Sequence, residues 1–343
     1  MFKQFFSRSR IKIFLSFLVG VAVALGGSYA WNGLAALRQP LRPGPLRLPD
    51  EQFPHISPLL ACGLSVNKAT RQYQSMENTM KNLVLQEQER DGIERVSIYY
   101  QDLSAGRWTG VQEYDTYSPA SLLKVPMMMH YFKQAEDDPT ILSRKIKIFA
   151  SDIQGGQEIP PAQSIQAGHE YTIDELIWYM IVHSDNDAFH ILTRLANNTS
   201  VLEMITDLGV EAPKANSNYV ISAKTYSLFF RILYNSTYLN REYSEKALKI
   251  LNQVEYKDGL VAPLPLGIQV AHKFGEAPFI TEDGKREREL HDCGIVYFPE
   301  HPYFLCVMTK GQDPVQLQQA IQKISEMVFD ITQQEPAKQA NAS

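Results

Sequence analysis

Segments that favour β-strands lie at both ends of the chain, and the segments between them favour helices. Residues 96–102 alternate β-branched and aromatic with polar residues, and Ser104-Ala105-Gly106 turns the chain into a second short strand at 108–111. The last third returns to strands at 269–274, 289–298 and 303–309. This order predicts an α+β fold, in which N- and C-terminal strands form one antiparallel sheet and an all-helical subdomain is inserted between them.

The helical segments are marked by apolar spacing and by capping residues. We expect an amphipathic helix over 68–90, and a second helix that begins near Ser118-Pro119. A third is indicated by Thr172-Ile173-Asp174-Glu175, which has the form of a capping box. Further helices are expected at 187–196, 223–234, 244–253 and 314–333.

The N-terminal region indicates export. An apolar stretch from Ile13 to Ala30 follows a basic segment and is long enough to cross a membrane as a helix. The basic flank would stay cytoplasmic, and Trp31 would lie at the interface. Ser28-Tyr29-Ala30 also fits a signal-peptide cleavage site, so the domain would be secreted if the segment is removed. Both interpretations place the folded domain outside the cytoplasm.

The domain boundaries follow from these patterns. Residues 1–12 form a basic cytoplasmic tail, and 13–31 a transmembrane helix or signal anchor. Residues 32–58 are rich in proline, which favours an extended spacer. The main folded domain is expected at 59–333, and a disordered tail at 334–343.

Charge and cysteine content limit the possible partners. The chain has 343 residues, 33 Lys and Arg against 38 Asp and Glu, and a net charge of −5, which disfavours nucleic-acid binding. Cys62, Cys293 and Cys306 are too widely spaced for a zinc site, and no metal or cofactor is predicted. One disulfide remains possible, but three buried thiols are the preferred interpretation.

A candidate nucleophile stands in Ser121-Leu122-Leu123-Lys124, just after an expected helix start. Side chains at i and i+3 share a helix face, so the amine of Lys124 can reach the hydroxyl of Ser121. A helix N-terminus favours the developing oxyanion, and an amine of lowered pKa can act as a base. The pattern S-x-x-K also occurs by chance in many chains, and on its own it is equally explained by a serine and a lysine on the surface.

Two further motifs follow in the sequence. Ser184-Asp185-Asn186 interrupts an apolar run between two expected helices, where an ordinary N-cap is the plainer explanation. Lys273-Phe274-Gly275 ends a probable strand, with a glycine that would let a ligand backbone approach closely.

Three motifs in the order S-x-x-K, S-D-N and K-x-G resemble the signatures of class A β-lactamases and penicillin-binding proteins. The resemblance covers roughly residues 59–333. It implies that Ser121 is the acylated nucleophile and Lys124 its proton acceptor. It also implies that Ser184 relays the proton to the leaving group.

The resemblance assigns the remaining site residues as well. Asn186 would orient the acyl side chain of the substrate, and Asp185 would organise its loop. Lys273 would orient Ser184 and attract the substrate carboxylate. The oxyanion hole would consist of the backbone N–H groups of Ser121 and of Glu276, the residue after Gly275.

Two departures from the family pattern affect the expected activity. Phe274 replaces the threonine of K-T-G and cannot donate a hydrogen bond to a carboxylate. The E-x-x-L-N loop, whose Glu activates the deacylating water, is missing, and Glu211 is the only acidic residue in the short segment 208–222. We expect that Glu211 is not this base and that an acyl-enzyme persists.

The sequence therefore indicates a serine hydrolase that transfers acyl groups from β-lactams or from the D-Ala-D-Ala ends of peptidoglycan stem peptides. A D,D-peptidase or another peptidoglycan hydrolase is the enzymatic alternative. A non-catalytic envelope protein that binds wall fragments is a second alternative. No histidine is fixed beside Ser121 by the sequence pattern.

Overall fold

The structure is a computed structural model that describes residues 53–57, 70–89, 92–196, 198–211, 219–280 and 284–340. All of these belong to the unit formed by residues 49–343. The predicted basic tail and the predicted membrane span at 13–31 lie outside the described residues. Among the residues that are described, no helix combines the length and apolar character that a membrane crossing requires.

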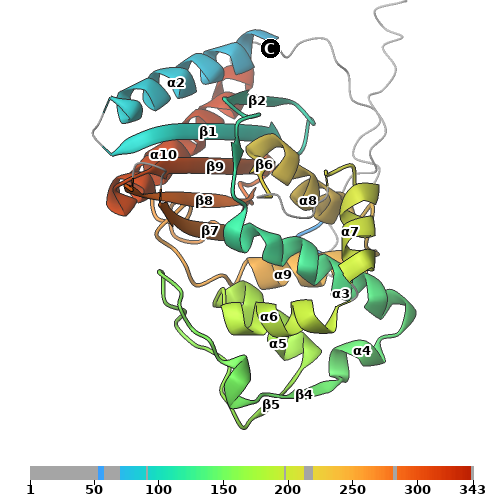
Figure 1. The fold of residues 1–343 in the computed structure, drawn as a ribbon. Coiled ribbons are helices and arrows are strands. Elements are labelled where there is room, and N and C mark those ends of the chain that lie inside the picture. Colours follow the sequence, from blue (N-terminus) through green and yellow to red (C-terminus); the bar gives the residue numbers. More distant parts are fainter. Residues whose placement is uncertain are drawn as a thin grey trace, which may run out of the picture. The chain divides into compact units, whose positions relative to one another are not determined.

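A five-stranded antiparallel sheet forms the centre of the domain (Figure 1), with strand order β2-β1-β9-β8-β7. The strands are β1 (Ile93–Asp102), β2 (Trp108–Val111), β7 (Val270–Ile280), β8 (Arg286–Val296) and β9 (Tyr303–Gly311). β1, from the first third of the chain, pairs with β9 along its whole length. The predicted α+β fold, with one sheet built from both ends of the chain, is confirmed.

Alternation along β1 divides the core into two layers. Ile98 and Tyr100 pack in a cluster with apolar residues of α2 (Thr70–Gln88) and α10 (Pro314–Ala340). Tyr99, between them, packs in a separate cluster with the helices on the opposite face. Successive side chains of a strand point to opposite faces, so one strand supplies both layers.

The inserted region between β2 and β7 is mainly helical. Its helices are α3 (Lys124–Asp137), α4 (Thr140–Ser143), α5 (Ile173–Val182), α6 (Asn186–Leu195), α7 (Asn198–Asp207), α8 (Ala223–Asn235) and α9 (Arg241–Leu251). Two short ladders join β3 (Thr116–Tyr117) to β6 (Ile221–Ser222) and β4 (Lys145–Lys147) to β5 (Glu170–Thr172). The 3-10 helices are η1 (Ala120–Leu123) and η2 (Ala150–Asp152). The predicted capping box forms at the start of α5, where Thr172 and Glu175 bond reciprocally.

The ends of the domain differ from the expected boundaries. The helix expected to end at 333 continues to Ala340. Residues 53–57, expected in the spacer, pack against the domain. The backbone N–H of His55 donates to Glu245 Oε2 at 2.8 Å, and Ile56 is 4% exposed. A short apolar segment with a histidine can satisfy both its buried side chain and its polar groups in this position.

A disulfide joins Cys293 on β8 to Cys306 on β9. The preference for three buried thiols was therefore wrong for these two, and Cys62 lies outside the described residues. The two cysteines are direct partners in the β8–β9 register, which brings their Cβ atoms close. Spacing in the sequence does not reveal strand register, so the pairing could not be derived from it.

Candidate active site

A cleft of about 160 Å³ brings together residues of all three sequence motifs. Its lining combines the predicted nucleophile, two residues of the second motif, the strand after Lys273, and a loop before β5. The lining residues are Ser121, Gly156, Gln157, Glu158, Ile159, Ser184, Asn186, Phe274, Glu276 and Pro278. Lys124 and Lys273, 1% and 0% exposed, belong to the same cluster through hydrogen bonds to Ser184.

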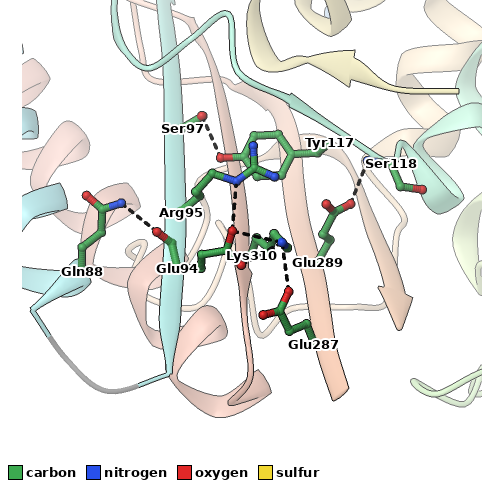
Figure 2. A network of polar contacts seen from close by, with 9 residues as sticks. All are labelled: Gln88, Glu94, Arg95, Ser97, Tyr117, Ser118, Glu287, Glu289 and Lys310. Carbon is green, nitrogen blue, oxygen red and sulfur yellow. Dashed lines mark hydrogen bonds and ion pairs between the residues drawn. The ribbon is translucent and has the colours of Figure 1, made fainter. Parts of the chain in front are cut away.

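The segment that precedes the nucleophile is fixed to the sheet. Figure 2 shows Ser118 bound by Glu289 of β8, whose Oε2 accepts from the Ser118 N–H at 2.7 Å. It also shows Tyr117 against β1, with its Oη 2.9 Å from Ser97 Oγ. His291 Nε2 donates to Ser118 O at 3.0 Å. These contacts determine where η1, and with it Ser121, meets the cleft.

The backbone is strained at Ser184 and at the residue before Ser121. Ala120, directly before Ser121, has φ of 47°, and Ser184 has φ of 57°. This left-handed conformation is energetically unfavourable for residues other than glycine, and such strained residues are enriched at functional sites. The strain is maintained by the surrounding contacts and fixes the directions in which the two hydroxyls lie.

Gly275 permits a close approach, and the segment that comes close to it is η1 with the residue before it. A Cβ at this position would lie 2.9 Å from Pro119 O and 3.1 Å from Leu122 Cγ. The sequence-based expectation was that a ligand backbone would use this space. The structure instead uses the missing side chain to bring η1 against β7, which sets the nucleophile beside the strand that carries Glu276.

Lys124 lies at the centre of the polar cluster. Its Nζ has three hydrogen-bond partners: the backbone oxygen of Ser184, Ser184 Oγ at 3.1 Å and Asn186 Oδ1 at 2.8 Å. Burial lowers the pKa of Lys124 to about 7, and the negative charge of Asp185 opposes this shift. A large fraction of Lys124 is therefore a neutral amine near pH 7, the form that accepts a proton.

Lys273 reaches the same serine from the strand side. Its Nζ donates to Ser184 Oγ and to Phe274 O, both at 2.9 Å. Burial lowers the pKa of Lys273 well below its ordinary value, and the nearby Lys124 lowers it further. Ser184 Oγ thus links two amines, which is the arrangement that a hydroxyl proton relay requires.

Asp185 holds the loop that carries Ser184. Its Oδ1 accepts from the N–H groups of Asp187 and Ala188 at 2.8 and 3.0 Å, which caps α6. Its Oδ2 accepts from Ile165 N–H at 2.9 Å. One buried carboxylate therefore ties the helix start to the preceding loop.

The loop over 153–168 is a part of the site that the sequence analysis missed. Gln157 Nε2 donates to Ser184 O at 2.8 Å, and Gln157 Oε1 accepts from Asn186 N–H at 3.0 Å. Asp187 Oδ1 accepts from Gln154 and Gly155 N–H. The sequence feature that could have indicated this loop is Gly155-Gly156. Both glycines adopt positive φ, a conformation of tight turns that glycine adopts readily.

Phe274 lies in the cleft with its ring stacked on Tyr256, at 4.2 Å between centroids and 27° between planes. Lys273 Nζ lies 4.0 Å from the centroid of the Phe274 ring. The side chain provides an apolar surface and no hydrogen-bonding group. Glu211 is exposed and is not among the residues that line the cleft, while 212–218 lie outside the described residues.

Three histidines close to the motifs have hydrogen-bond partners other than Ser121. His183 Nδ1 lies 2.9 Å from Glu255 Oε2, and His272 Nδ1 lies 2.8 Å from Asp292 Oδ1. His291 contacts Ser118, as described above. Among the described residues, Lys124 and Lys273 are the basic side chains that hydrogen-bond to Ser184.

A comparison with protein families matches residues 75–332 to the model of the Beta-lactamase enzyme family. The chain belongs to this family. The matched segment holds all three motifs and the whole of the five-stranded sheet. The family and fold are those of a β-lactamase-like serine hydrolase.

Solved structures of the same fold agree with this family. A β-lactamase from Chitinophaga pinensis DSM 2588 aligns with a TM-score of 0.64 and 20% identity, over 75% of this chain and 99% of that one. PBP-A aligns with a TM-score of 0.63 and 19% identity, over 75% and 96%. The TLA-1 extended-spectrum β-lactamase aligns with a TM-score of 0.66 and 16% identity, over 76% and 99%. A comparison with curated proteins found no match.

Proposed function

We propose that the chain is an acyl-transfer enzyme in which Ser121 attacks β-lactams or the D-Ala-D-Ala ends of peptidoglycan stem peptides. The observation that carries this proposal is the position of Ser184 Oγ, 3.1 Å from Lys124 Nζ and 2.9 Å from Lys273 Nζ, in a cleft that Ser121 also lines. A nucleophile, a base of lowered pKa and a relay hydroxyl are the groups that acyl transfer needs.

The steps follow from the protonation of these groups. Neutral Lys124 takes the proton of Ser121 as Oγ attacks the carbonyl carbon. The N–H groups of Ser121 and Glu276 stabilise the oxyanion. The amide bond then breaks, and Ser184 passes a proton from Lys124 to the leaving nitrogen while Lys273 holds its hydroxyl. The product is an ester on Ser121.

A D,D-peptidase is the second candidate, favoured by the missing water-activating glutamate. Glu211 is exposed and does not line the cleft. If hydrolysis of the ester on Ser121 is slow, the acyl-enzyme survives long enough to be isolated. One comparison structure is a PBP-A variant captured as an acyl-enzyme complex with penicillin G. Release of D-Ala from a muropeptide, compared with cephalosporin hydrolysis, distinguishes the two candidates.

Labelling with a fluorescent penicillin tests the proposed chemistry. The purified full chain should form a covalent adduct that peptide mapping assigns to Ser121. Ser121→Ala should remove the label while circular dichroism shows the same fold. Labelling that persists in Ser121→Ala would contradict the proposal, and a protein that never labels would favour a non-catalytic binding role.

We also propose that the domain works outside the cytoplasm, held to the membrane by residues 13–31. The apolar stretch with its basic flank supports this location. The disulfide between Cys293 and Cys306 is a second support, because such bonds persist in oxidising compartments. Protease added to spheroplasts should digest the domain, and protection from that protease while the cytoplasmic membrane stays intact would contradict the proposed location.

A further inference from the structure

Two carboxylates line the cleft, and none of its described lining residues is cationic. Glu158 and Glu276 are the acidic members of the lining. The nearby amines of Lys124 and Lys273 are buried and already bound to Ser184. An anionic group that enters the cleft is therefore repelled by the carboxylates of the lining, and no cation among the described lining residues offsets this repulsion.

One arginine holds both carboxylates at the edge of the cleft. Arg288 Nη1 lies 2.8 Å from Glu276 Oε1, and Arg288 Nη2 contacts Glu158 Oε2. A single guanidinium against two carboxylates leaves an excess of one negative charge. The side chain of Glu276 is 10% exposed, so solvent screens its charge weakly.

The same bridge joins the two walls of the cleft. Glu158 comes from the 153–168 loop and Glu276 from β7, while Gln157 ties that loop to Ser184 and Asn186. The backbone N–H of Ile159 also bonds to the Glu276 carboxylate. The positions of the two charges are therefore fixed by contacts on several sides.

Phe274 supplies the surface next to Glu276. Its ring lies against Tyr256 and offers no donor to an incoming group. The cleft volume of about 160 Å³ is small beside the usual several hundred Å³ of ligand pockets. Next to this ring, a compact uncharged group can be buried at a lower desolvation cost than a carboxylate, which would find no donor on Phe274.

We propose that the cleft prefers acyl donors whose group beside Phe274 and Glu276 is uncharged, such as a primary amide, over donors that carry a free carboxylate there. Glu276 is the specificity-determining residue for this choice. The inference rests on the proposed acyl transfer to Ser121 and names the substrate class of that site. Penicillins and peptides that end in D-Ala-D-Ala both carry a carboxylate, so both should be slower donors than matched amides. Penicillins still react because the lactam ring is strained.

A matched pair of thioester donors tests the preference. Both are N-acyl-D-alanyl thioesters, and their thiol portions end either in a free carboxylate or in a primary amide. Ser121 Oγ forms the ester as the carbon–sulfur bond breaks, and the Ser121 proton passes through Lys124 and Ser184 to the departing sulfur. Quenched samples of the full chain are analysed by intact-protein mass, which counts the acylated fraction for each donor.

We expect the amide donor to acylate Ser121 at least about tenfold faster, because a like charge opposes the carboxylate donor. Glu276→Gln keeps the backbone N–H and should reduce the ratio of the two rates several-fold. Glu326→Gln removes an exposed charge on α10 and serves as the matched control, with an unchanged ratio.

Three results would overturn the inference in distinguishable ways. A carboxylate donor that reacts as fast or faster would refute the preference while acyl transfer itself stands. A ratio that Glu276→Gln leaves unchanged would show that another group sets the preference. Absence of an adduct with either donor, and with fluorescent penicillin, would refute the acyl-transfer function together with the inference.

Discussion

Lys124 Nζ lies 3.1 Å from Ser184 Oγ, so a direct hydrogen bond joins the first two sequence motifs although sixty residues separate them. The same amine also contacts the backbone oxygen of Ser184 and Asn186 Oδ1. The base and the relay are consequently one unit, and removing either should affect the same step.

Lys124→Ala should reduce the rate of Ser121 acylation by about 10²–10⁴-fold, the usual contribution of a general base. Lys249→Ala, which removes an exposed lysine on α9, is the matched control and should react normally. Stopped-flow measurement with a fluorescent penicillin gives both rates. Equal rates in the Lys124 variant and the control would exclude Lys124 as the base.

Acylation should depend on pH through the amine of Lys124. Burial lowers its pKa to about 7. The neutral amine is the base, so the rate should rise as pH increases through about 7 and fall below it, where Lys124 is protonated. Asp185→Asn removes the charge that opposes the shift, and the acid limb should then move to lower pH. A rate that stays constant from pH 5 to 9 is incompatible with this role.

Gly275→Ala should weaken the site without adding or removing a polar group. The new Cβ would lie 2.9 Å from the backbone oxygen of Pro119, which must shift together with η1. Overpacking of this kind costs roughly 1–3 kcal/mol of unfolding free energy. Urea unfolding and acylation rates should both decline. Gly284→Ala is a control for the loss of a glycine, because its added Cβ would have nothing within 4 Å, although the positive φ adds local strain.

Deacylation should be slow compared with acylation. Glu211, the only acidic residue in segment 208–222, is exposed and does not line the cleft. The two glutamates that do line it, Glu158 and Glu276, are held by Arg288. A chromogenic cephalosporin should therefore produce a burst followed by slow turnover. Glu211→Gln should leave the slow phase nearly unchanged. Sustained rapid hydrolysis that this substitution abolishes would identify Glu211 as the missing base.

The disulfide should stabilise the sheet behind the site. Cys293 is the register partner of Lys273 on one side and of Cys306 on the other. Replacing both cysteines by alanine should lower the unfolding free energy by about 2–5 kcal/mol, as for native disulfides in small domains. Chemical denaturation of the oxidised chain and the double variant measures the difference. No difference would mean that the bond does not form in the protein.

The sequence predicts the elements of this fold better than their contacts. The alternation at 96–102 and the capping box at Thr172 correspond to β1 and α5, because both patterns act within one element. The three motifs predict which residues gather at the cleft. Cys293 and Cys306 show the opposite case, because their pairing depends on the register of two strands.

The 153–168 loop was not recognised as part of the active site for a similar reason. Gln157 acts through bonds to Ser184 and Asn186, about thirty residues away, and no local periodicity marks such a contact. The use of Gly275 was misread because the sequence shows the missing side chain but not what fills the space. Long-range packing therefore accounts for the parts of the site that the sequence did not reveal.

The most direct measurement is the location and lifetime of an adduct on the full chain treated with fluorescent penicillin. The proposed chemistry predicts one covalent label on Ser121, formed faster than it is lost, and absent from Ser121→Ala and strongly slowed in Lys124→Ala. A label on any other residue, or one that survives in Ser121→Ala, would contradict the assignment of Ser121 as the nucleophile.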